Sequence, residues 1–268
     1  MSRTIGTVVR GVRAPIFRQG DDVVSIAADT VANALAEEGI TPRDVVAITE
    51  SVVARCQGNY ATVQQIAADV KAKTGGKTVG VTFPILSRNR FSLLLSGIAS
   101  GAKKIVLLLS LPSDEVGNHL VSMDQLDEAG VDPYRDVLTL EQFRSHFGSV
   151  IHPFTGVDYV DYYQSIIQEA GAQVEIIFSN RVQSILPYTD TVICCDIHTR
   201  QRSKRLLKSA GARCVLGLDD LLTASVDGSG YNPQYGLLGS NKADDGRVKL
   251  FPRDTMAVAE ALGQALSQ

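Results

Sequence analysis

Three short polar stretches of this 268-residue chain could carry chemistry, because each follows a run of apolar residues. They are Arg55-Cys56-Gln57-Gly58-Asn59, Ser87-Arg88-Asn89-Arg90 and Asp196-Ile197-His198-Thr199-Arg200. Loops that follow strands are where α/β proteins usually bind ligands. Arginine can hold a phosphate or carboxylate through two parallel hydrogen bonds, and the first turn of a helix attracts anions. These stretches therefore indicate a site for an anionic ligand.

Within these stretches, the candidates for phosphate binding are Arg55, Gln57, Asn59, Arg88 and Arg90. Asp196 stands where a strand-end carboxylate binds a metal or a ribose. Structural interpretations remain open beside these: a solvated turn after Arg55, a capped helix with surface arginines, and Thr199 as a helix cap. The chain contains no Walker A loop, GxGxxG, HExxH, GxSxG or EF-hand pattern, so any function depends on less standard groupings.

Alternating apolar strands and helices are predicted to position the second and third stretches. Continuous apolar strands of this kind indicate a parallel sheet that is covered on both faces. The strands are expected at 78–83, 104–109, 173–178, 191–197 and 213–218, and the helices at 87–100, 157–170, 181–186 and 200–209. Gly101, Gly171 and Gly211 each stand between a helix and the next strand, where a left-handed glycine ends a helix.

The two ends of the chain are predicted to be α+β. We expect strands at 8–12, 44–49 and 248–251, the second of them continuing through 51–59 into a polar turn. Helices are expected from Asp21 or Asp22 to about Glu38, at 63–73, and at 256–266 behind a capping Asp254.

Composition excludes several classes of protein. Hydrophobic residues make up 44% of the chain and charged residues 21%, so bulk disorder is excluded. The net charge of −3 argues against a general nucleic-acid binder, and the longest apolar stretch is too short to span a membrane. The start lacks the apolar core of a signal peptide, and the four cysteines form no CxxC pair. We therefore expect a cytoplasmic protein with buried thiols.

The first section resembles the coenzyme F(420)-0:L-glutamate ligase family. The resemblance is carried by Ala14-Pro15-Ile16, Gly20-Asp21-Asp22 and Asp44-Val45-Val46. It continues in Val53-Ala54-Arg55-Cys56-Gln57-Gly58, where the family has Val-Ser-Lys-Ala-Glu-Gly. Arg55 thus replaces a lysine and keeps its charge, whereas Gln57 replaces a glutamate and does not.

The last section resembles the family's metal-binding stretch, Asn-Ala-Gly-Ile-Asp-x-Ser-Asn, in either of two registers. One register places Ser-Asn on Ser240-Asn241 and Gly on Gly236, which puts Leu238 where the metal-binding Asp should be. The other places Asn on Asn241 and Asp on Asp245, and then Ser-Asn is lost. By this resemblance Ser240 and Asn241 join the phosphate-binding candidates, and Asp245 joins Asp196 as a metal candidate.

Longer bacterial members of the family extend the resemblance to nearly the whole chain. The matching stretches begin at Phe83, Asp114 and Cys195 and end at Phe91, His119 and Arg200. The resemblance implies an α/β protein whose ligase-like domain, residues 1–76 and 223–268, flanks an inserted Rossmann-like parallel-sheet domain, residues 77–222. We expect the ligase-like domain to lack the family's C-terminal segment.

The resemblance also implies an activity. It predicts a GTP-dependent ligase that uses Mg²⁺ or Mn²⁺ to join L-glutamate to the carboxylate of a coenzyme-like acceptor, in a homodimer. The alternatives are a non-catalytic module that binds a nucleotide or phosphometabolite, and one part of a larger ligase.

Overall fold

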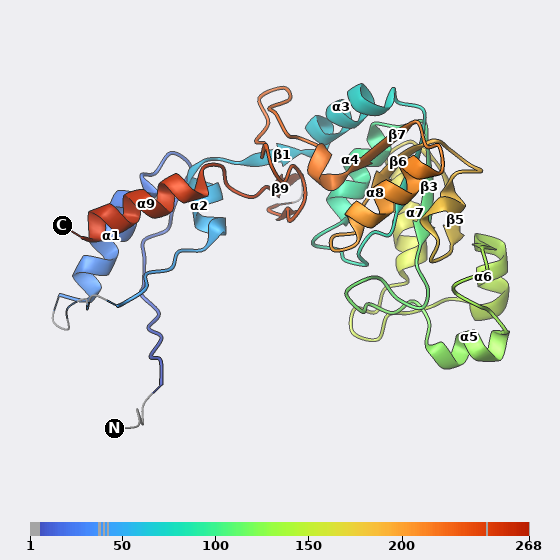
Figure 1. The fold of residues 1–268 in the computed structure, drawn as a ribbon, viewed down its shortest axis with the longest axis horizontal. Coiled ribbons are helices and arrows are strands. Elements are labelled where there is room, and N and C mark those ends of the chain that lie inside the picture. Colours follow the sequence, from blue (N-terminus) through green and yellow to red (C-terminus); the bar gives the residue numbers. More distant parts are fainter. Residues whose placement is uncertain (1–5, 37–38, 40, 42, 245, 268) are drawn as a thin grey trace. The chain divides into compact units, whose positions relative to one another are not determined.

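The computed structural model describes residues 6–36, 39, 41, 43–244 and 246–267, and these form two compact units (Figure 1). Unit 1 comprises the described residues up to Asn59 together with those from Pro252 onward. Unit 2 runs from Tyr60 to Phe251. The domains expected from the family resemblance, residues 1–76 with 223–268 and residues 77–222, stay a prediction. No helix among the described residues is long and apolar enough to cross a membrane.

Unit 1 is helical. Its helices are α1 (Val23–Ala34), α2 (Glu50–Cys56) and α9 (Thr255–Leu266), and α9 packs beside α1. Asp22 caps α1 as predicted, because its carboxylate accepts the backbone N–H groups of Val24 and Ser25. The predicted end of α1 at Glu38 lies outside the described residues.

Three predictions for unit 1 are wrong. The described residues of this unit contain no strand, so the runs at 8–12 and 44–49 are not strands, and helix α2 replaces the predicted continuation of the second strand, although Gln57 and Gly58 do form the predicted turn. Val53, Ala54 and Cys56 are buried at spacings that fit one face of a helix. Asp254 stands at the N-cap of α9, but its side chain makes no capping hydrogen bond.

Unit 2 contains a six-stranded sheet, as the alternating pattern predicts. Its order is β4-β5-β3-β2-β6-β7, and every neighbouring pair is parallel except β4 with β5. The strands are β2 (Thr78–Thr82), β3 (Lys104–Leu109), β4 (Leu138–Thr139), β5 (Gln173–Phe178), β6 (Thr191–Cys194) and β7 (Cys214–Gly217).

Helices cover both faces of this sheet, as the continuous apolar strands predict. Ile105, Leu107 and Leu109 of β3 pack into the larger core, whereas Val106 and Leu108 pack into the smaller core on the other face. The helices and 3₁₀ turns are α3 (Val63–Thr74), α4 (Ser92–Ser100), α5 (Met123–Ala129), α6 (Leu140–Phe147), α7 (Tyr159–Glu169), α8 (Arg200–Ser209), η1 (Val182–Ile185) and η2 (Leu218–Asp220).

Two details of this region differ from the sequence prediction. Helix α4 begins at Ser92 and not at Ser87, because residues 88–91 form a turn. Gly101 has a φ of −87°, so it does not end α4 in a left-handed conformation, although Gly171 and Gly211 do have positive φ. A Cβ at Gly101 would lie 2.6 Å from the carbonyl oxygen of Ala67, so close packing of α3 on α4 explains this glycine.

A small antiparallel sheet completes unit 2. It consists of β1 (Tyr60–Thr62), β9 (Arg247–Lys249) and β8 (Asn241–Lys242), with β9 in the centre. Its strand β9 corresponds to the strand that was predicted at 248–251. The structure is therefore a mixed α/β protein with a mostly parallel six-stranded sheet and a separate small antiparallel one.

Candidate functional site

The loops that follow β2, β3 and β6 meet at one edge of the six-stranded sheet. Asp114 holds the loop after β2, because its Oδ2 accepts the N–H of Leu86 at 2.7 Å. Glu115 holds the loop after β6, since its carboxylate accepts the N–H groups of Ile197 and, at 3.0 Å, His198. The three stretches that resemble the longer family members are thus joined by hydrogen bonds.

The turn that carries Arg88 and Arg90 and the segment that follows Ser240-Asn241 meet through one backbone hydrogen bond in unit 2. The backbone N–H of Lys242 donates to the carbonyl oxygen of Asn89 at 2.9 Å, which places β8 against the 88–91 turn. The side chains of Arg88, Arg90 and Asn241 are exposed. Ser240 is buried, and its hydroxyl oxygen has no hydrogen-bond partner. Exposed guanidinium groups such as those of Arg88 and Arg90 can bind a phosphate.

Asp196 lies just beyond β6 and is fully buried. Its Oδ2 accepts hydrogen bonds from the hydroxyls of Thr199 at 2.7 Å and Ser203 at 2.8 Å, whereas its Oδ1 has no partner. Burial raises the pKa of Asp196 above its ordinary value, and the nearby Glu115 carboxylate adds to the rise. Thr199 stands at the N-cap of α8 as predicted, but its side chain makes no capping hydrogen bond and binds Asp196 instead.

The first predicted stretch lies in unit 1, where its polar side chains bind another part of the chain. Gln57 exchanges two hydrogen bonds with the backbone of Arg253, at 2.7 and 2.8 Å. The Arg253 guanidinium donates to Asn59 Oδ1 at 2.6 Å. Arg55 is exposed near the end of α2. Sequence reasoning missed Arg253, because only the folded chain brings it to the 57–59 turn.

The described part of the chain forms no metal-binding cage. Among the described residues, no group of three or more His, Cys, Asp or Glu side chains could hold a metal ion. Asp245 lies outside the described residues. Its neighbour Asp244 is engaged by Arg247 at 2.6 and 2.8 Å, and these hydrogen bonds lower the pKa of Asp244. Of the two metal candidates, Asp196 is therefore the one whose contacts the structure describes.

Three of the four cysteines are buried as predicted, and Cys214 is partly exposed. All four are free, and Cys56, Cys194 and Cys195 are buried. Burial raises the pKa of Cys194 to about 12, so its thiol stays protonated at neutral pH. Such a thiol is a poor nucleophile.

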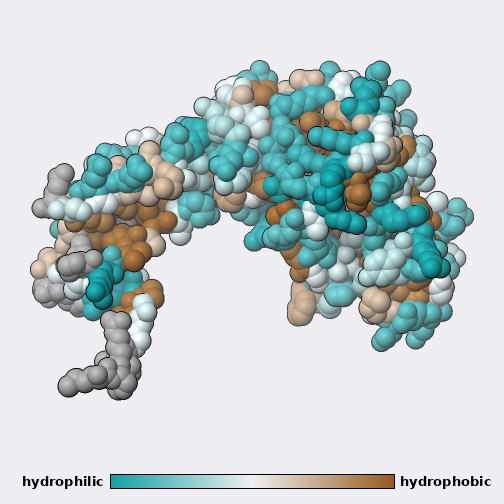
Figure 2. All heavy atoms as spheres, viewed as in Figure 1, coloured by the Kyte–Doolittle hydropathy of each residue, from teal (hydrophilic) through white to brown (hydrophobic). Residues whose placement is uncertain are grey.

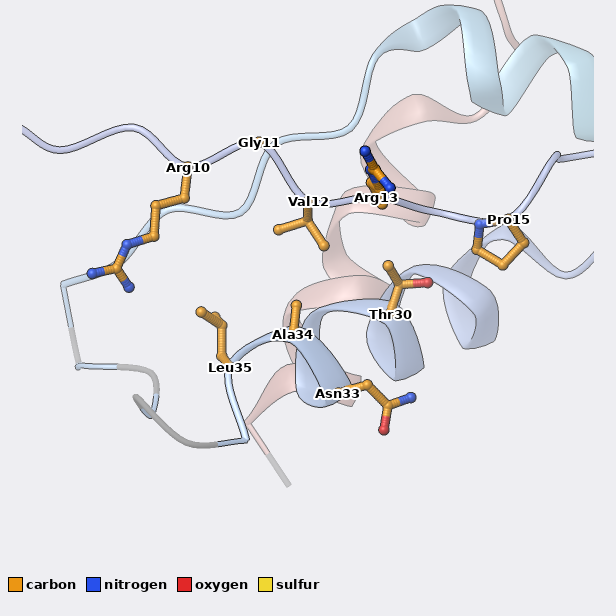
Figure 3. Close-up of a pocket in the computed structure, with 9 residues that line it drawn as sticks. All are labelled: Arg10, Gly11, Val12, Arg13, Pro15, Thr30, Asn33, Ala34 and Leu35. Carbon is orange, nitrogen blue, oxygen red and sulfur yellow. The ribbon is translucent and has the colours of Figure 1, made fainter.

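Unit 1 also contains a cavity of about 550 Å³ that sequence reasoning did not find. Figure 3 shows the extended segment from Arg10 to Pro15 passing along α1, with Val12 directed toward Ala34 and Leu35. Arg10, Arg13, Thr30 and Asn33 also line the cavity. None of the predicted site residues does so.

The loop after β2 carries two exposed arginines and the loop after β6 carries a buried aspartate, at the carboxyl ends of strands where α/β proteins usually bind ligands. The sequence profile of one family, F420-0:gamma-glutamyl ligase, matches residues 11–268. The chain therefore belongs to the F420-0:gamma-glutamyl ligase family, whose members are amide-forming ligases. No curated protein shows a significant match to the chain.

Proposed function

We propose that this protein is a GTP-dependent γ-glutamyl ligase. An acceptor carboxylate attacks the γ-phosphorus of the nucleotide, which yields an acyl phosphate and releases the nucleoside diphosphate. The amine of L-glutamate then attacks the acyl carbon, so an amide forms and inorganic phosphate leaves with the bonding electron pair. The acceptor is F420-0 or a coenzyme-like carboxylate related to it.

The observation that carries this proposal is the extent of the family match, which includes the whole six-stranded sheet. The chemistry of the site supports it. Transfer of a phosphoryl group needs cationic and N–H groups around the phosphates. Arg88 and Arg90 would supply the cations, and the backbone bond from Lys242 N to Asn89 O is consistent with Ser240 and Asn241 contributing to the same site.

A divalent cation, Mg²⁺ or Mn²⁺, belongs to the proposal through the nucleotide. Mg²⁺ is usually bound by one or two carboxylates together with substrate phosphates, and needs no cage made only of protein. By the family resemblance, Asp245 is the candidate carboxylate for this role. The cation would neutralise charge on the triphosphate. The side chains of Arg88 and Arg90 would orient the phosphates.

The direct test is release of inorganic phosphate from GTP, or from ATP, in the presence of Mg²⁺ or Mn²⁺, L-glutamate and an F420-0 acceptor. Turnover that requires all components, together with an amide product identified by mass spectrometry, supports the proposal. Nucleotide binding without turnover would instead indicate the non-catalytic alternative. No nucleotide binding by calorimetry would contradict both.

Replacing Arg88 and Arg90 together with alanine is expected to lower kcat/KM for the nucleotide by about 100-fold, because charge on the transferred phosphoryl group loses two cations. The matched control is Arg135→Ala. The Arg135 side chain is 87% exposed, and its ion pair with Asp132, at 3.6 Å, is long. The control should keep the activity of the unmodified protein. Equal activity in both variants would exclude the two arginines from the site.

We further propose that the enzyme is a homodimer that buries apolar surface of unit 1. Val9, Ile16 and Val45 are 89%, 78% and 90% exposed. Figure 2 shows brown, hydrophobic surface on the part of the molecule that belongs to unit 1. Exposed apolar surface of this kind is typical of interfaces. Light scattering should give twice the monomer mass, and Val9→Asp with Val45→Asp should shift the protein to monomer.

A further inference from the structure

An internal carboxylate occupies two backbone donors at the start of α8. Glu115, in the loop after β3, accepts the N–H groups of both Ile197 and His198. These residues directly precede Thr199, the N-cap of the ten-residue helix α8. Two adjacent backbone N–H groups in a turn form a favourable place for an anion. Glu115 is partly exposed, so this place is open to solvent.

The strand order puts these donors where open parallel sheets bind ligands. The chain runs outward from β2 to β3 and β5, and it then returns to the other side of β2 as β6 and β7. The order therefore reverses between β2 and β6, and ligands of such sheets bind in the crevice at the carboxyl ends of these two strands.

The loops after β2 and β6 lie beside this crevice. The backbone N–H groups of Leu86 and Ser87, in the loop after β2, already donate to buried side chains. Asp114 accepts the N–H of Leu86, and the Tyr163 hydroxyl accepts the N–H of Ser87 while it donates to Ile85 O at 2.6 Å. Asp114 and Tyr163 are both buried. The loop after β6 differs, because its donors are covered by a partly exposed side chain that can rotate away.

A second observation at the same place points to a ligand. Asp196 is fully buried, and its Oδ2 lies against the first turn of α8 through Thr199 and Ser203. Its Oδ1 has no hydrogen-bond partner. A buried acceptor without a donor is costly, and a bound hydroxyl would remove that cost.

We propose that the β6–α8 loop is a second ligand site, which takes a phosphate monoester that also carries a hydroxyl group. The phosphate displaces Glu115 from the N–H groups of Ile197 and His198. The hydroxyl donates to Asp196 Oδ1, which becomes accessible once Glu115 has rotated away. A sugar phosphate or the ribose phosphate of a nucleotide has both groups.

The loop that carries Glu115 is held at its base, so displacement needs only a side-chain rotation. Asp114 Oδ1 accepts the N–H groups of Val116 at 3.0 Å and Asn118 at 2.9 Å. Its Oδ2 also accepts from the side-chain amide of Asn118 at 2.7 Å. Glu115 thus acts as a displaceable cover on an otherwise fixed site.

The test titrates the full chain with ribose 5-phosphate and, separately, with inorganic phosphate. Glu115→Ala is expected to bind ribose 5-phosphate about tenfold more tightly than the unmodified protein, because the competing charge is gone. Glu128→Ala is the matched control, since Glu128 is exposed on α5. Unchanged affinity in Glu115→Ala would overturn the proposal, and so would equal affinity for inorganic phosphate, because Asp196 would then contribute nothing.

A second measurement needs no variant. In the unmodified protein, saturating ribose 5-phosphate should shift the amide resonances of Ile197 and His198 and leave those of Leu86 and Ser87 unchanged. Shifts confined to other residues would overturn the proposal. Replacing Arg88 and Arg90 should leave this binding intact, so the second site and the proposed ligase activity can fail separately.

Discussion

Replacing Asp158 with asparagine is expected to destabilise unit 2 by about 3–5 kcal/mol at neutral pH, the range for removing one partner of a buried ion pair. Arg144 donates to both carboxylate oxygens of Asp158, at 2.8 and 3.0 Å. The same carboxylate accepts the N–H of Val150 at 2.8 Å and caps α7. The asparagine would leave the partly buried guanidinium without its buried counter-charge, and only the exposed Asp161 would remain beside it.

This loss should depend on pH. Burial by itself would raise the pKa of Asp158, but hydrogen bonds from Arg144 and from backbone N–H groups outweigh it and lower the pKa below the ordinary value of 3.8. A carboxyl with a depressed folded-state pKa stabilises the fold above its unfolded pKa, and it loses that effect as the pH falls through the folded value. The difference between Asp158→Asn and the unmodified protein should therefore be full at pH 7 and shrink below pH 3.8.

Asp161→Asn is the matched control, because Asp161 contacts the same guanidinium at 2.6 Å with a side chain that is 63% exposed. Exposed pairs typically contribute less than about 1 kcal/mol. Urea unfolding of the two variants at several pH values gives the comparison. Equal destabilisation by both would show that burial of the Asp158 pair is not what matters.

The six-stranded sheet could be predicted because its strands are apolar on both faces. The β3 sequence Lys104–Leu109 fits only a strand covered by two cores, and the structure shows both cores. The same reasoning failed at 44–49, where Val45 and Val46 are β-branched but the described residues of unit 1 contain no strand to pair with them. A short apolar run is compatible with a strand, but it forms one only where another strand is available to pair with it.

The candidate site could be predicted only where its residues are close in sequence. Arg88 and Arg90 were found from local charge, and Ser240 and Asn241 from the family resemblance. The segments that carry these pairs are joined by the bond from Lys242 N to Asn89 O, which local sequence could not predict because the segments are far apart in the chain. Glu115 was not predicted as a site residue, because its role depends on which backbone donors its carboxylate reaches after folding.

Replacing Gly236 with alanine is expected to destabilise unit 2 by more than about 4 kcal/mol, an exceptional value for one methyl group. Gly236 has a φ of +51°, which costs a residue with a Cβ about 1–2 kcal/mol. The new Cβ would also lie 2.3, 2.8 and 2.9 Å from the carbonyl oxygens of Leu221, Leu218 and Asp219. All three are backbone atoms, so the 218–221 turn must move to admit the methyl group.

Gly228→Ala isolates the backbone part of this effect. Gly228 has a φ of +74°, but nothing lies within 4 Å of a Cβ built there. Its replacement should cost only about 1–2 kcal/mol, because the left-handed conformation alone is strained. Chemical denaturation followed by circular dichroism measures both variants. If their midpoints fall equally, the close approach of Gly236 to the 218–221 turn does not limit stability; if Gly236→Ala alone loses most of its stability, that approach requires a glycine.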